Sequence, residues 1–377
     1  MAIFLLKKMG DIRKMPTEKD MLDMLVSGNL SLPPLAFRLK QIDPAIGENR
    51  RSEALVEVSW KNAKADFIVE CKSKWTPRVF ENTLNMIKMY ANQTGYLPMI
   101  IMPFLSEFQL EELDREEISG VDLCGNGIVI APGRFFVHRS GNKNQFRYSE
   151  YIQNIYRKNT SMVSRVFFTR SEYNAVQKIC DEVNKRNILV TRWKTRPMSL
   201  STVSKALKTL DEDLIVDRNN TIRLLQPEKL LEKLSENYKP KTTLKRIRIK
   251  LSEEKDTTQV LNEISKKTGL PFVATGTSSV TKYAVMQRSD MLSVYCPRIF
   301  ALQELNIISR NQSDRFPNLE IIESDDETLY FDAKEEQNFL WASPVQVYLE
   351  LMAGDKRDQE TAEQVKSFIL NNLKRVK

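Results

Sequence analysis

The sequence predicts a multidomain α/β protein, and three changes of pattern along the chain indicate this. Over residues 1–155, short apolar strand patterns are separated by turn residues and by helical spacing, which is typical of an α/β unit. Over residues 156–240, short helices end in a strand–turn–strand segment. Over residues 241–377, strand and helix patterns alternate again, which predicts a C-terminal α/β domain. The 377 residues suffice for two or three domains, each with a core.

Two strands joined by a polar turn organise the first domain, within residues 53–72. An alternating apolar run (EALVEV) precedes the turn, and a second apolar run (DFIVEC) follows it. Side chains alternate between the two faces of a strand, so Cys71 is expected to face away from Glu70 and Lys72 and to be buried. One face of the hairpin then carries four charged side chains, Glu53, Glu57, Glu70 and Lys72.

The pairing of the two strands determines which charged groups meet. With the turn centred on Asn62-Ala63, Glu53 lies opposite Lys72, and Glu57 lies opposite Ile68. Carboxylates on neighbouring strands bind hard cations such as Mg²⁺ or Mn²⁺, which polarise a phosphodiester and activate water. A nearby lysine offers a compact positive charge to the developing oxyanion. The hairpin therefore predicts a metal-dependent phosphodiesterase site.

This arrangement resembles the PD-(D/E)XK nuclease superfamily, whose signature is an acid on one strand and Asp/Glu-x-Lys on the next. The resemblance implies a restriction-endonuclease-like α/β core in which Glu53, Glu70 and Lys72 are catalytic. It also implies that Glu53 and Glu70 hold Mg²⁺ or Mn²⁺, with Glu53 in place of the usual Asp. Glu57 is a less favoured first acid, and Asp66 is excluded because four strand residues place it roughly 13 Å from Glu70.

Further elements of the first domain follow from local signals. We expect a helix beginning near Thr17, a short helix over residues 35–42, a helix opened by Thr76-Pro77, and a buried strand over residues 98–103. Turn residues between short strands follow, and Asp122 among them is a weaker candidate for a further acid at the nuclease site.

The second domain carries the predicted DNA contacts. A helix over residues 170–187 precedes a second helix that begins at Ser199 and has small hydroxyls and lysines on its outer face. A strand–turn–strand wing follows, with its turn over residues 217–220. This order resembles the winged helix-turn-helix family, in which the second helix enters the DNA major groove. The resemblance implies DNA contacts from Ser201, Thr202, Lys205, Lys208 and Arg218.

The third domain begins with alternating basic residues over 239–250, a strand whose cationic face is a candidate for phosphate contacts. A helix over 254–268 and a small-residue segment over 275–279 follow; the latter either holds an anion or, as we favour, simply caps a helix. Ser343-Pro344 then opens the helix SPVQVYLEL. The order of these blocks, over about residues 160–370, resembles the AbiEi family of type IV antitoxins. The resemblance implies a DNA-binding autoregulator whose partner system includes a nucleotidyltransferase-like toxin.

Composition excludes several classes of function. The chain has 57 Lys and Arg against 49 Asp and Glu, a net charge of +8, which favours a polyanionic partner. Its four cysteines form no CxxC pair, which argues against a zinc ribbon or disulfide framework and suits a reducing cytoplasm. The only histidine is His138, so a Ser-His-Asp triad or a His-rich metal site is not expected. The apolar start, MAIFLLKK, is too short for a signal peptide or membrane span.

The sequence thus favours a cytoplasmic DNA-binding protein with a nuclease site, a Mg²⁺-dependent DNA endonuclease in phage defence or mobile-element control. The alternative is a non-catalytic transcriptional autoregulator or antitoxin of a type IV toxin–antitoxin system that keeps the nuclease fold as a DNA clamp. The expected partners are DNA and a nucleotidyltransferase-like toxin or its operator, with no membrane.

Overall fold

The computed structural model describes residues 15–47, 50–74, 76–146, 154–193, 195–241, 244–251, 256–286, 291–299 and 316–375. The chain divides into an N-terminal unit, residues 1–153, and a C-terminal unit, residues 154–377. Both units are mixed α/β. The expected division after residue 240 falls inside the C-terminal unit and stays a prediction. The apolar start of the chain lies outside the described residues.

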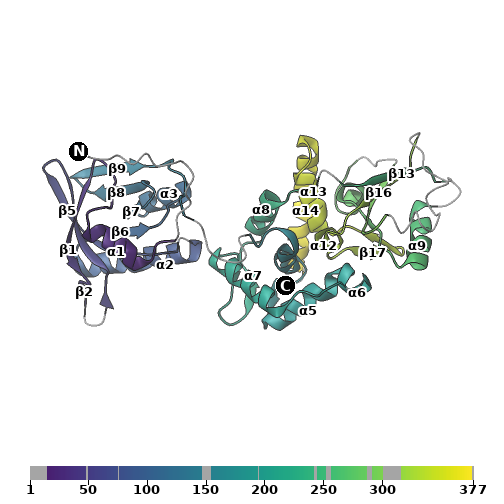
Figure 1. The fold of residues 1–377 in the computed structure, drawn as a ribbon, viewed down its shortest axis with the longest axis horizontal. Helices are drawn as coiled ribbons and strands as arrows, with labels where there is room; N and C mark the ends of the chain where they lie inside the picture. The colour runs from purple at the N-terminus through teal and green to yellow at the C-terminus, as the bar shows by residue number, and fades with distance from the viewer. Residues whose placement is uncertain are drawn as a thin grey trace, which may run out of the picture. The chain divides into compact units, whose positions relative to one another are not determined.

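A seven-stranded sheet forms the centre of the N-terminal unit, in the order β1-β4-β5-β6-β7-β8-β9 (Figure 1). Its strands are β1 (Ala36–Ile42), β4 (Ala54–Trp60), β5 (Ala63–Cys71), β6 (Leu97–Met102), β7 (Ser119–Asp122), β8 (Gly127–Ala131) and β9 (Phe135–Arg139). The pairs β5–β6 and β6–β7 are parallel, and the other pairs are antiparallel. A separate ribbon pairs β2 (Ala45–Ile46) with β3 (Arg50–Arg51). The strand expected over residues 98–103 is confirmed as β6.

Helices cover both faces of this sheet. They are α1 (Glu18–Val26), α2 (Pro77–Thr94) and α3 (Glu107–Arg115). Met21 and Leu25 of α1 pack on one face, together with Cys71. The apolar side of α2, with Phe80 and Ile87, packs with α3 on the other face. Alternation along β5 sends successive side chains into these two separate cores, which is why its apolar run is unbroken.

The first strand of the sheet corrects one prediction. Residues 36–42 form β1, an edge strand paired antiparallel with β4, and not the helix expected over residues 35–42. Phe37 and Leu39 are half-buried between exposed neighbours, so the apolar period is two, as in a strand with one face on the core. Periodicity over so few residues is ambiguous, so the same run also fits a short helix. The helix expected from Thr17 is confirmed, and its Thr17 side chain accepts from the Asp20 backbone N–H.

The first part of the C-terminal unit is mainly helical and carries a small antiparallel sheet in the order β10-β12-β11. Its elements are η1 (Lys158–Thr160), α4 (Ser161–Arg165), η2 (Val166–Phe168), β10 (Glu172–Tyr173), α5 (Val176–Arg186), α6 (Ile188–Trp193), α7 (Leu200–Glu212), β11 (Val216–Asp217), β12 (Ile222–Leu224) and α8 (Pro227–Asn237). The helix expected over residues 170–187 begins only at Val176, because Glu172 and Tyr173 pair with β12 instead. The hairpin expected after α7 is present as β11 and β12.

A mixed six-stranded sheet, in the order β13-β16-β15-β14-β18-β17, forms the rest of the C-terminal unit. Its strands are β13 (Arg246–Ile249), β14 (Val273–Ala274), β15 (Leu292–Cys296), β16 (Leu319–Glu323), β17 (Lys334–Glu336) and β18 (Phe339–Trp341). Its helices are α9 (Thr257–Thr268), α10 (Gly276–Ser279), η3 (Val280–Lys282), α12 (Glu327–Tyr330), α13 (Pro344–Met352) and α14 (Lys356–Arg375). The helix expected from Ser343-Pro344 is confirmed as α13, and Ser343 caps it.

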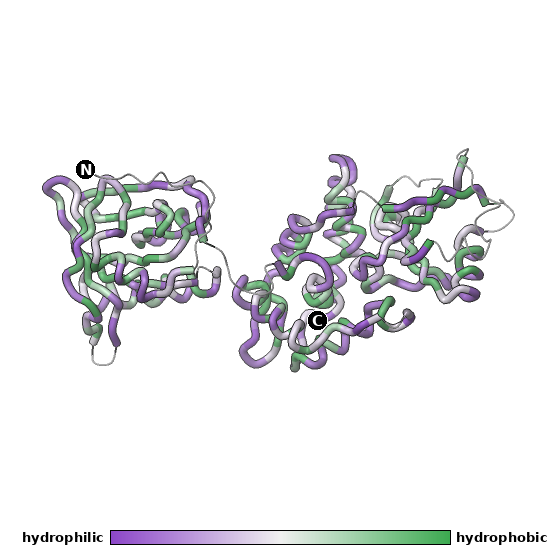
Figure 2. Tube along the Cα trace, viewed as in Figure 1, coloured by the Kyte–Doolittle hydropathy of each residue, from purple (hydrophilic) through white to green (hydrophobic). Residues whose placement is uncertain are grey.

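Hydropathy along the chain follows these layers. Figure 2 shows hydrophobic segments along the inner strands of the N-terminal sheet and along α13, and hydrophilic segments in the turns and on outer helix faces. Helix α13 is buried along most of its length, whereas α14 buries only one side. Helix α8 packs against both α13 and α14. No helix among the described residues is long and apolar enough to cross a membrane.

Candidate functional site

The β4–β5 hairpin is tighter than predicted, which shifts its register by two residues. Trp60 lies opposite Ala63, so the turn is Lys61-Asn62, and Glu57 lies opposite Asp66 rather than Ile68. The left-handed backbone of Lys61 (φ 52°) closes this short turn. The expected pairing of Glu53 with Lys72 is therefore wrong. Because an even shift keeps every side chain on its face, Glu53 and Glu70 still share one face.

The three predicted site residues nevertheless meet. The Lys72 Nζ lies 2.6 Å from Glu70 Oε1 and 3.9 Å from Glu53 Oε1. A fourth residue, Glu18 in the first turn of α1, places its Oε1 3.9 Å from the same Nζ. Glu18 has no local sequence signal for this role, because nothing distinguishes it from an ordinary acidic residue at a helix start. We call Glu18, Glu53, Glu70 and Lys72 the acid–lysine cluster.

Burial perturbs the carboxyl groups of this cluster. Burial first, and then the nearby Glu70 charge, raise the pKa of Glu53 from its usual 4.5 to about 7, although Lys72 opposes the shift. Burial also raises the pKa of Glu70, against the hydrogen bond from Lys72. For Lys72, burial alone would lower the pKa, but the bond to Glu70 and the surrounding carboxylates raise it overall. The single ammonium of Lys72 therefore compensates only part of the negative charge of the three surrounding glutamates.

Glu53 and Glu70 are the two side chains of the cluster that could hold a divalent cation. Glu70 Oε2 is buried and has no hydrogen-bond partner within the described part of the chain, so one carboxylate oxygen is left with an unsatisfied lone pair there. Glu53, whose Oε1 lies 3.9 Å from the Lys72 Nζ, supplies the second carboxylate. Mg²⁺ usually takes one or two protein carboxylates and keeps waters or substrate phosphates as its other ligands. Among the described residues, no group of three or more His, Cys, Asp or Glu side chains forms a metal-binding geometry.

Three other acids of the N-terminal unit that the sequence offered as candidates form ion pairs or hydrogen bonds outside the cluster. Asp66 pairs with Lys40 at 2.8 Å, and Glu57 pairs with Lys64 at 3.2 Å. Asp122, a candidate further acid, is buried and accepts hydrogen bonds from the backbone N–H groups of Leu105, Cys124 and Asn126. It organises the loop between β7 and β8, which gives it a structural role, and its role at the nuclease site stays a prediction.

Cys71 is buried, and it also lies next to the acid–lysine cluster. It is fully buried in the core under α1, as predicted. Its thiol nevertheless hydrogen-bonds to Glu53, which lies at the start of the paired strand. Burial raises the pKa of this thiol further, with the Glu53 charge adding to the effect. Cys71 is therefore a neutral packing residue that also touches one acid of the cluster.

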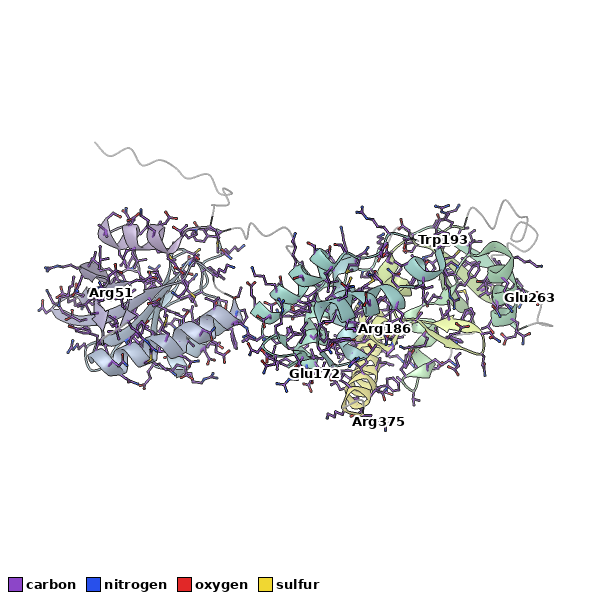
Figure 3. All side chains as sticks on the ribbon, turned by 90° about the horizontal axis from the view of Figure 1, so that it is seen from below. Arg51, Glu172, Arg186, Trp193, Glu263 and Arg375 are labelled. Atoms are coloured by element: carbon purple, nitrogen blue, oxygen red, sulfur yellow. The ribbon has the colours of Figure 1, made fainter. Side chains whose placement is uncertain are left out.

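Helix α7 presents the second group of predicted contacts. Val203, Ala206, Leu207 and Leu210 are buried on its inner side. On its outer side, Ser201, Lys205 and Lys208 are exposed and Thr202 is half-buried. The Ser199 hydroxyl caps the helix by accepting from the Thr202 N–H at 3.3 Å. Arg218 lies half-buried in the turn between β11 and β12. Figure 3 shows side chains on the surrounding elements, with Glu172 and Arg186 labelled.

Positive charge concentrates in this segment. Residues 154–240 contain 17 Lys and Arg against 10 Asp and Glu, a net charge of +7. Residues 1–153 have 20 against 19, and residues 241–377 have 20 against 20, so they contribute +1 and zero. Nearly all of the net charge of +8 therefore lies in the segment that contains α7 and the β11–β12 hairpin. An excess of positive charge in one segment of the chain favours a polyanionic partner for that segment.

Two other candidate anion contacts are satisfied within the chain. Arg246 and Arg248 on β13 both pair with the buried carboxylate of Glu320, at 3.4 and 3.2 Å. The basic strand expected over residues 239–250 is therefore partly neutralised. At the start of α10, the Gly276 N–H donates to Glu350 at 2.7 Å, and Thr275 caps the helix. That helix start is occupied by a carboxylate of the protein itself, in agreement with the favoured capping interpretation.

Fold and side chains together define a multidomain α/β protein with an acid–lysine cluster in one unit and, in the other, a helix with two exposed lysines. Residues 223–371 match the model of a family described as "Transcriptional regulator, AbiEi antitoxin, Type IV TA system". The match runs from β12 to α14 and begins after α7. No curated protein matches the chain, and no solved structure matches it. The family similarity supports the regulator and antitoxin reading, which the sequence analysis kept as its alternative, over the nuclease reading.

Proposed function

We propose that the protein is a DNA-binding transcriptional regulator that acts as the antitoxin of a type IV toxin–antitoxin system. The similarity of residues 223–371 to AbiEi antitoxins carries this proposal. The excess of positive charge over residues 154–240, directly ahead of and overlapping the matched region, supplies the physical means of binding DNA. The proposed partners are operator DNA and a nucleotidyltransferase-like toxin.

DNA reading is assigned to α7 and the hairpin after it. The order of α5, α7 and the β11–β12 hairpin, with β10 completing a three-stranded sheet, is consistent with a winged helix. In such a fold α7 enters the major groove and the hairpin contacts the flanking backbone. Ser201 and Thr202 are then placed toward base edges or phosphates, while Lys205, Lys208 and Arg218 neutralise phosphates.

The test combines binding with toxin neutralisation. Full-length protein should protect a defined site in the DNA upstream of its own gene in a footprinting assay, and its expression should rescue cells from the toxin encoded beside it. Loss of both activities in a correctly folded protein would contradict the proposal. Rescue without any DNA protection would leave an antitoxin that does not regulate its own gene.

A second candidate function belongs to the N-terminal unit, a metal-dependent phosphodiesterase. The buried, unpartnered Glu70 Oε2 beside Glu53 and Lys72 favours it. Glu53 and Glu70 would hold Mg²⁺ or Mn²⁺, which when bound polarises a phosphodiester and activates water. The ammonium of Lys72, fixed by Glu70, provides positive charge where the oxyanion develops. The alternative is that this unit only clamps DNA.

Substitution at the cluster separates cleavage from clamping. Lys72→Ala should lower any turnover by about two orders of magnitude or more while leaving DNA affinity nearly unchanged, because it removes charge needed only in the transition state. Glu70→Gln should abolish the metal dependence. Lys64→Ala is the matched control, since Lys64 pairs with Glu57 on the same hairpin outside the cluster. Cleavage is measured with Mg²⁺ or Mn²⁺, and binding with Ca²⁺, on duplex, single-stranded and branched DNA. A wild-type protein that binds these substrates but cuts none of them would contradict the phosphodiesterase function. The N-terminal unit would then act only as a DNA clamp.

A further inference from the structure

The β2–β3 ribbon lies directly beside the acid–lysine cluster. Its second strand, β3, ends two residues before Glu53. At the base of the ribbon, the Asp43 N–H donates to the Glu53 carbonyl at 3.1 Å. The buried Ser52 hydroxyl donates to the Val69 carbonyl, one residue before Glu70 on β5. An extended chain spans at most about 3.6 Å per residue, so the Cα atoms of Arg50 and Glu53 lie within about 11 Å of each other.

The two arginines of β3 face opposite sides of the ribbon, because successive side chains of a strand alternate. Arg50 lies opposite Ile46, and paired residues of antiparallel strands share a face. Ile46 is buried in the core under α2, so Arg50 faces α2, where its guanidinium donates to the Met89 sulfur at 2.7 Å. Arg51, labelled in Figure 3, faces the other way and donates to the Asp43 carbonyl at 3.4 Å.

Arg50 shares this side of the sheet with Glu70 and Lys72. Glu70 is on the same face of β5 as Ile68, which packs in the core under α2. Tyr90 of α2, buried in that core, is affected by all three charges. Burial first, and then the Glu70 charge, raise the pKa of Tyr90, whereas the charges of Arg50 and Lys72 oppose the shift. The Arg50 guanidinium is therefore a near neighbour of the cluster in space as well as in sequence.

Positive charge at Arg50 is not compensated by a contact. Arg50 is exposed, and within the described part of the chain it has no carboxylate partner. In the cluster itself, the Lys72 ammonium balances the charge of one glutamate, and a divalent cation would balance the other two. Arg50 then adds one positive charge beyond this balance, on the side of the sheet where a phosphate would approach the cluster.

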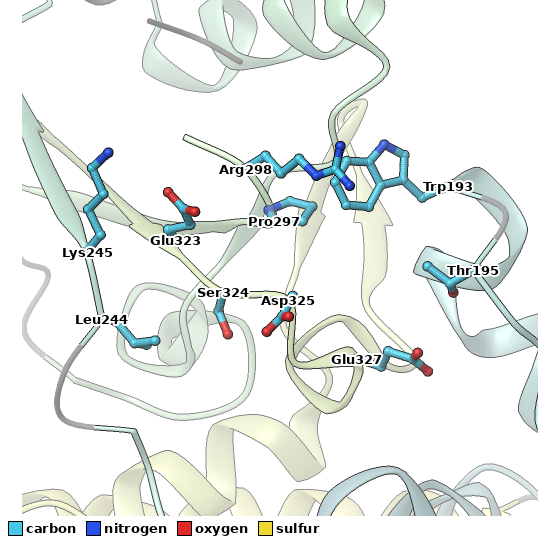
Figure 4. Close-up of a pocket in the computed structure, with 10 residues that line it drawn as sticks. All are labelled: Trp193, Thr195, Leu244, Lys245, Pro297, Arg298, Glu323, Ser324, Asp325 and Glu327. Atoms are coloured by element: carbon cyan, nitrogen blue, oxygen red, sulfur yellow. The ribbon is translucent and has the colours of Figure 1, made fainter. Parts of the chain in front are cut away.

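The cations around a cavity in the C-terminal unit are compensated, in contrast to Arg50. The cavity has a volume of about 870 Å³, and five charged side chains line it. Figure 4 shows Glu323 between Lys245 and Arg298, and Asp325 and Glu327 add two further carboxylates. Its size is that of a small-molecule site, but its charges do not favour an anion.

From these observations we infer that Arg50 binds a backbone phosphate next to the phosphate at the acid–lysine cluster. The ligand of the N-terminal unit is then a nucleic-acid chain that continues past the cluster. A guanidinium donates two parallel hydrogen bonds to phosphate oxygens, which suits this role. Each strand of a DNA duplex carries one phosphate per about 3.4 Å of its axis, so a neighbouring phosphate falls within reach of Arg50. A mononucleotide, with phosphate at the cluster only, leaves Arg50 unpaired. The inference rests on the phosphodiesterase or clamp function proposed for this unit.

The binding test uses the full-length Lys205→Ala, Lys208→Ala protein, in which α7 contributes little, and Ca²⁺ in place of Mg²⁺. Its ligands are single-stranded and duplex DNA without the operator sequence. Adding Arg50→Gln should weaken binding by about tenfold, because one charge-assisted contact to phosphate is lost. The log–log salt slope should fall by about one unit. Arg51→Gln is the matched control: it removes the same charge from the opposite face of the ribbon, and affinity should change by less than about twofold.

Cleavage with Mg²⁺ gives a second readout that a merely structural role would not produce. Arg50→Gln should raise KM for DNA by about tenfold and leave kcat nearly unchanged, because the contact is made in the ground state and the transition state alike. Hydrolysis of bis(4-nitrophenyl) phosphate, which has a single phosphodiester and no neighbouring phosphate, should be the same as in wild type. Equal losses of kcat on both substrates would overturn the assignment of Arg50.

The binding measurement decides the inference even if the protein cleaves nothing. Unchanged DNA affinity in Arg50→Gln would overturn the inference and leave the phosphodiesterase proposal standing. Equal weakening by Arg50→Gln and Arg51→Gln would also overturn it, because only net charge would then matter. A Lys205→Ala, Lys208→Ala protein that binds no DNA would overturn both the inference and the clamp. Wild-type protein without cleavage activity would contradict the phosphodiesterase alone.

Discussion

At the scale of single residues, Glu53 is the group whose ionisation is most informative. It hydrogen-bonds to the buried thiol of Cys71 and lies beside the carboxylate of Glu70, and its pKa is raised to about 7. The folded carboxyl keeps its proton up to about pH 7, whereas the unfolded carboxyl releases it near 4.5. Between these two values the folded state binds more protons, so the contribution of Glu53 to stability falls as the pH rises.

This titration gives a prediction for Glu53→Gln, which mimics the protonated carboxyl at every pH. Relative to wild type, the variant should gain about 1 kcal/mol in free energy of unfolding between pH 5 and pH 8, after allowance for solvent screening. Urea unfolding at the two pH values measures the difference, with Glu57→Gln as the control. Mg²⁺ should reduce the gain, because a bound cation stabilises the wild-type carboxylate. A difference that stays constant from pH 5 to pH 8 would show that Glu53 is not perturbed as described.

At the scale of elements, α13 connects the helical segment over residues 154–240 to the C-terminal sheet through buried polar groups. Arg165 of α4 donates to the Gln346 side-chain oxygen at 2.9 Å and to the Thr328 carbonyl at 3.0 Å. The Gln346 amide in turn donates to Glu350 and to the Tyr238 hydroxyl. Gln346 thus bridges a buried guanidinium and a buried carboxylate that do not touch each other directly. Burial lowers the pKa of Arg165 to about 10 and raises that of Glu350.

Removal of the Gln346 bridge should destabilise the C-terminal unit. Gln346→Leu removes the amide that Arg165 and Glu350 share. Arg165 then keeps only its bond to the Thr328 carbonyl, and Glu350 keeps those from the Gly276 N–H and the Tyr295 hydroxyl. With one hydrogen bond lost on each buried charged group, the C-terminal unit should lose about 2 kcal/mol of unfolding free energy. Gln359→Leu on the exposed side of α14 is the control and should change stability by less than about 0.5 kcal/mol. Urea denaturation of the full chain measures both variants. If the Gln346→Leu and Gln359→Leu variants had the same free energy of unfolding, the Gln346 bridge would not contribute to stability.

At the scale of the whole molecule, the sequence predicted elements whose signals are local. The helix caps at Thr17, Ser199 and Ser343 and the apolar runs of β5 and β6 all have short-range signatures, and the structure contains these elements. The β4–β5 register was missed because the turn lacks the Asn-Gly or Asp-Gly pair that marks a two-residue hairpin loop.

Groups brought together from distant parts of the chain had no sequence signal. Glu18 joins Lys72 across more than fifty residues, and Arg165 meets Gln346 across 181. The neutralisation of Arg246 and Arg248 by Glu320 likewise depends on the pairing of β13 with β16. Such contacts follow from tertiary packing, so residue types alone predict a candidate group without its partners.

The central proposal, that the protein regulates transcription by reading DNA with α7, is tested most directly by the salt dependence of operator binding. Lys205 and Lys208 are exposed on α7, within the segment that carries a net charge of +7. The double variant Lys205→Ala, Lys208→Ala should bind operator DNA more weakly. Its log–log salt slope should be smaller by about one unit for each lost phosphate contact. Lys266→Ala on α9 is the control and should match wild type. Unchanged affinity and an unchanged slope in the double variant would contradict the assignment of α7.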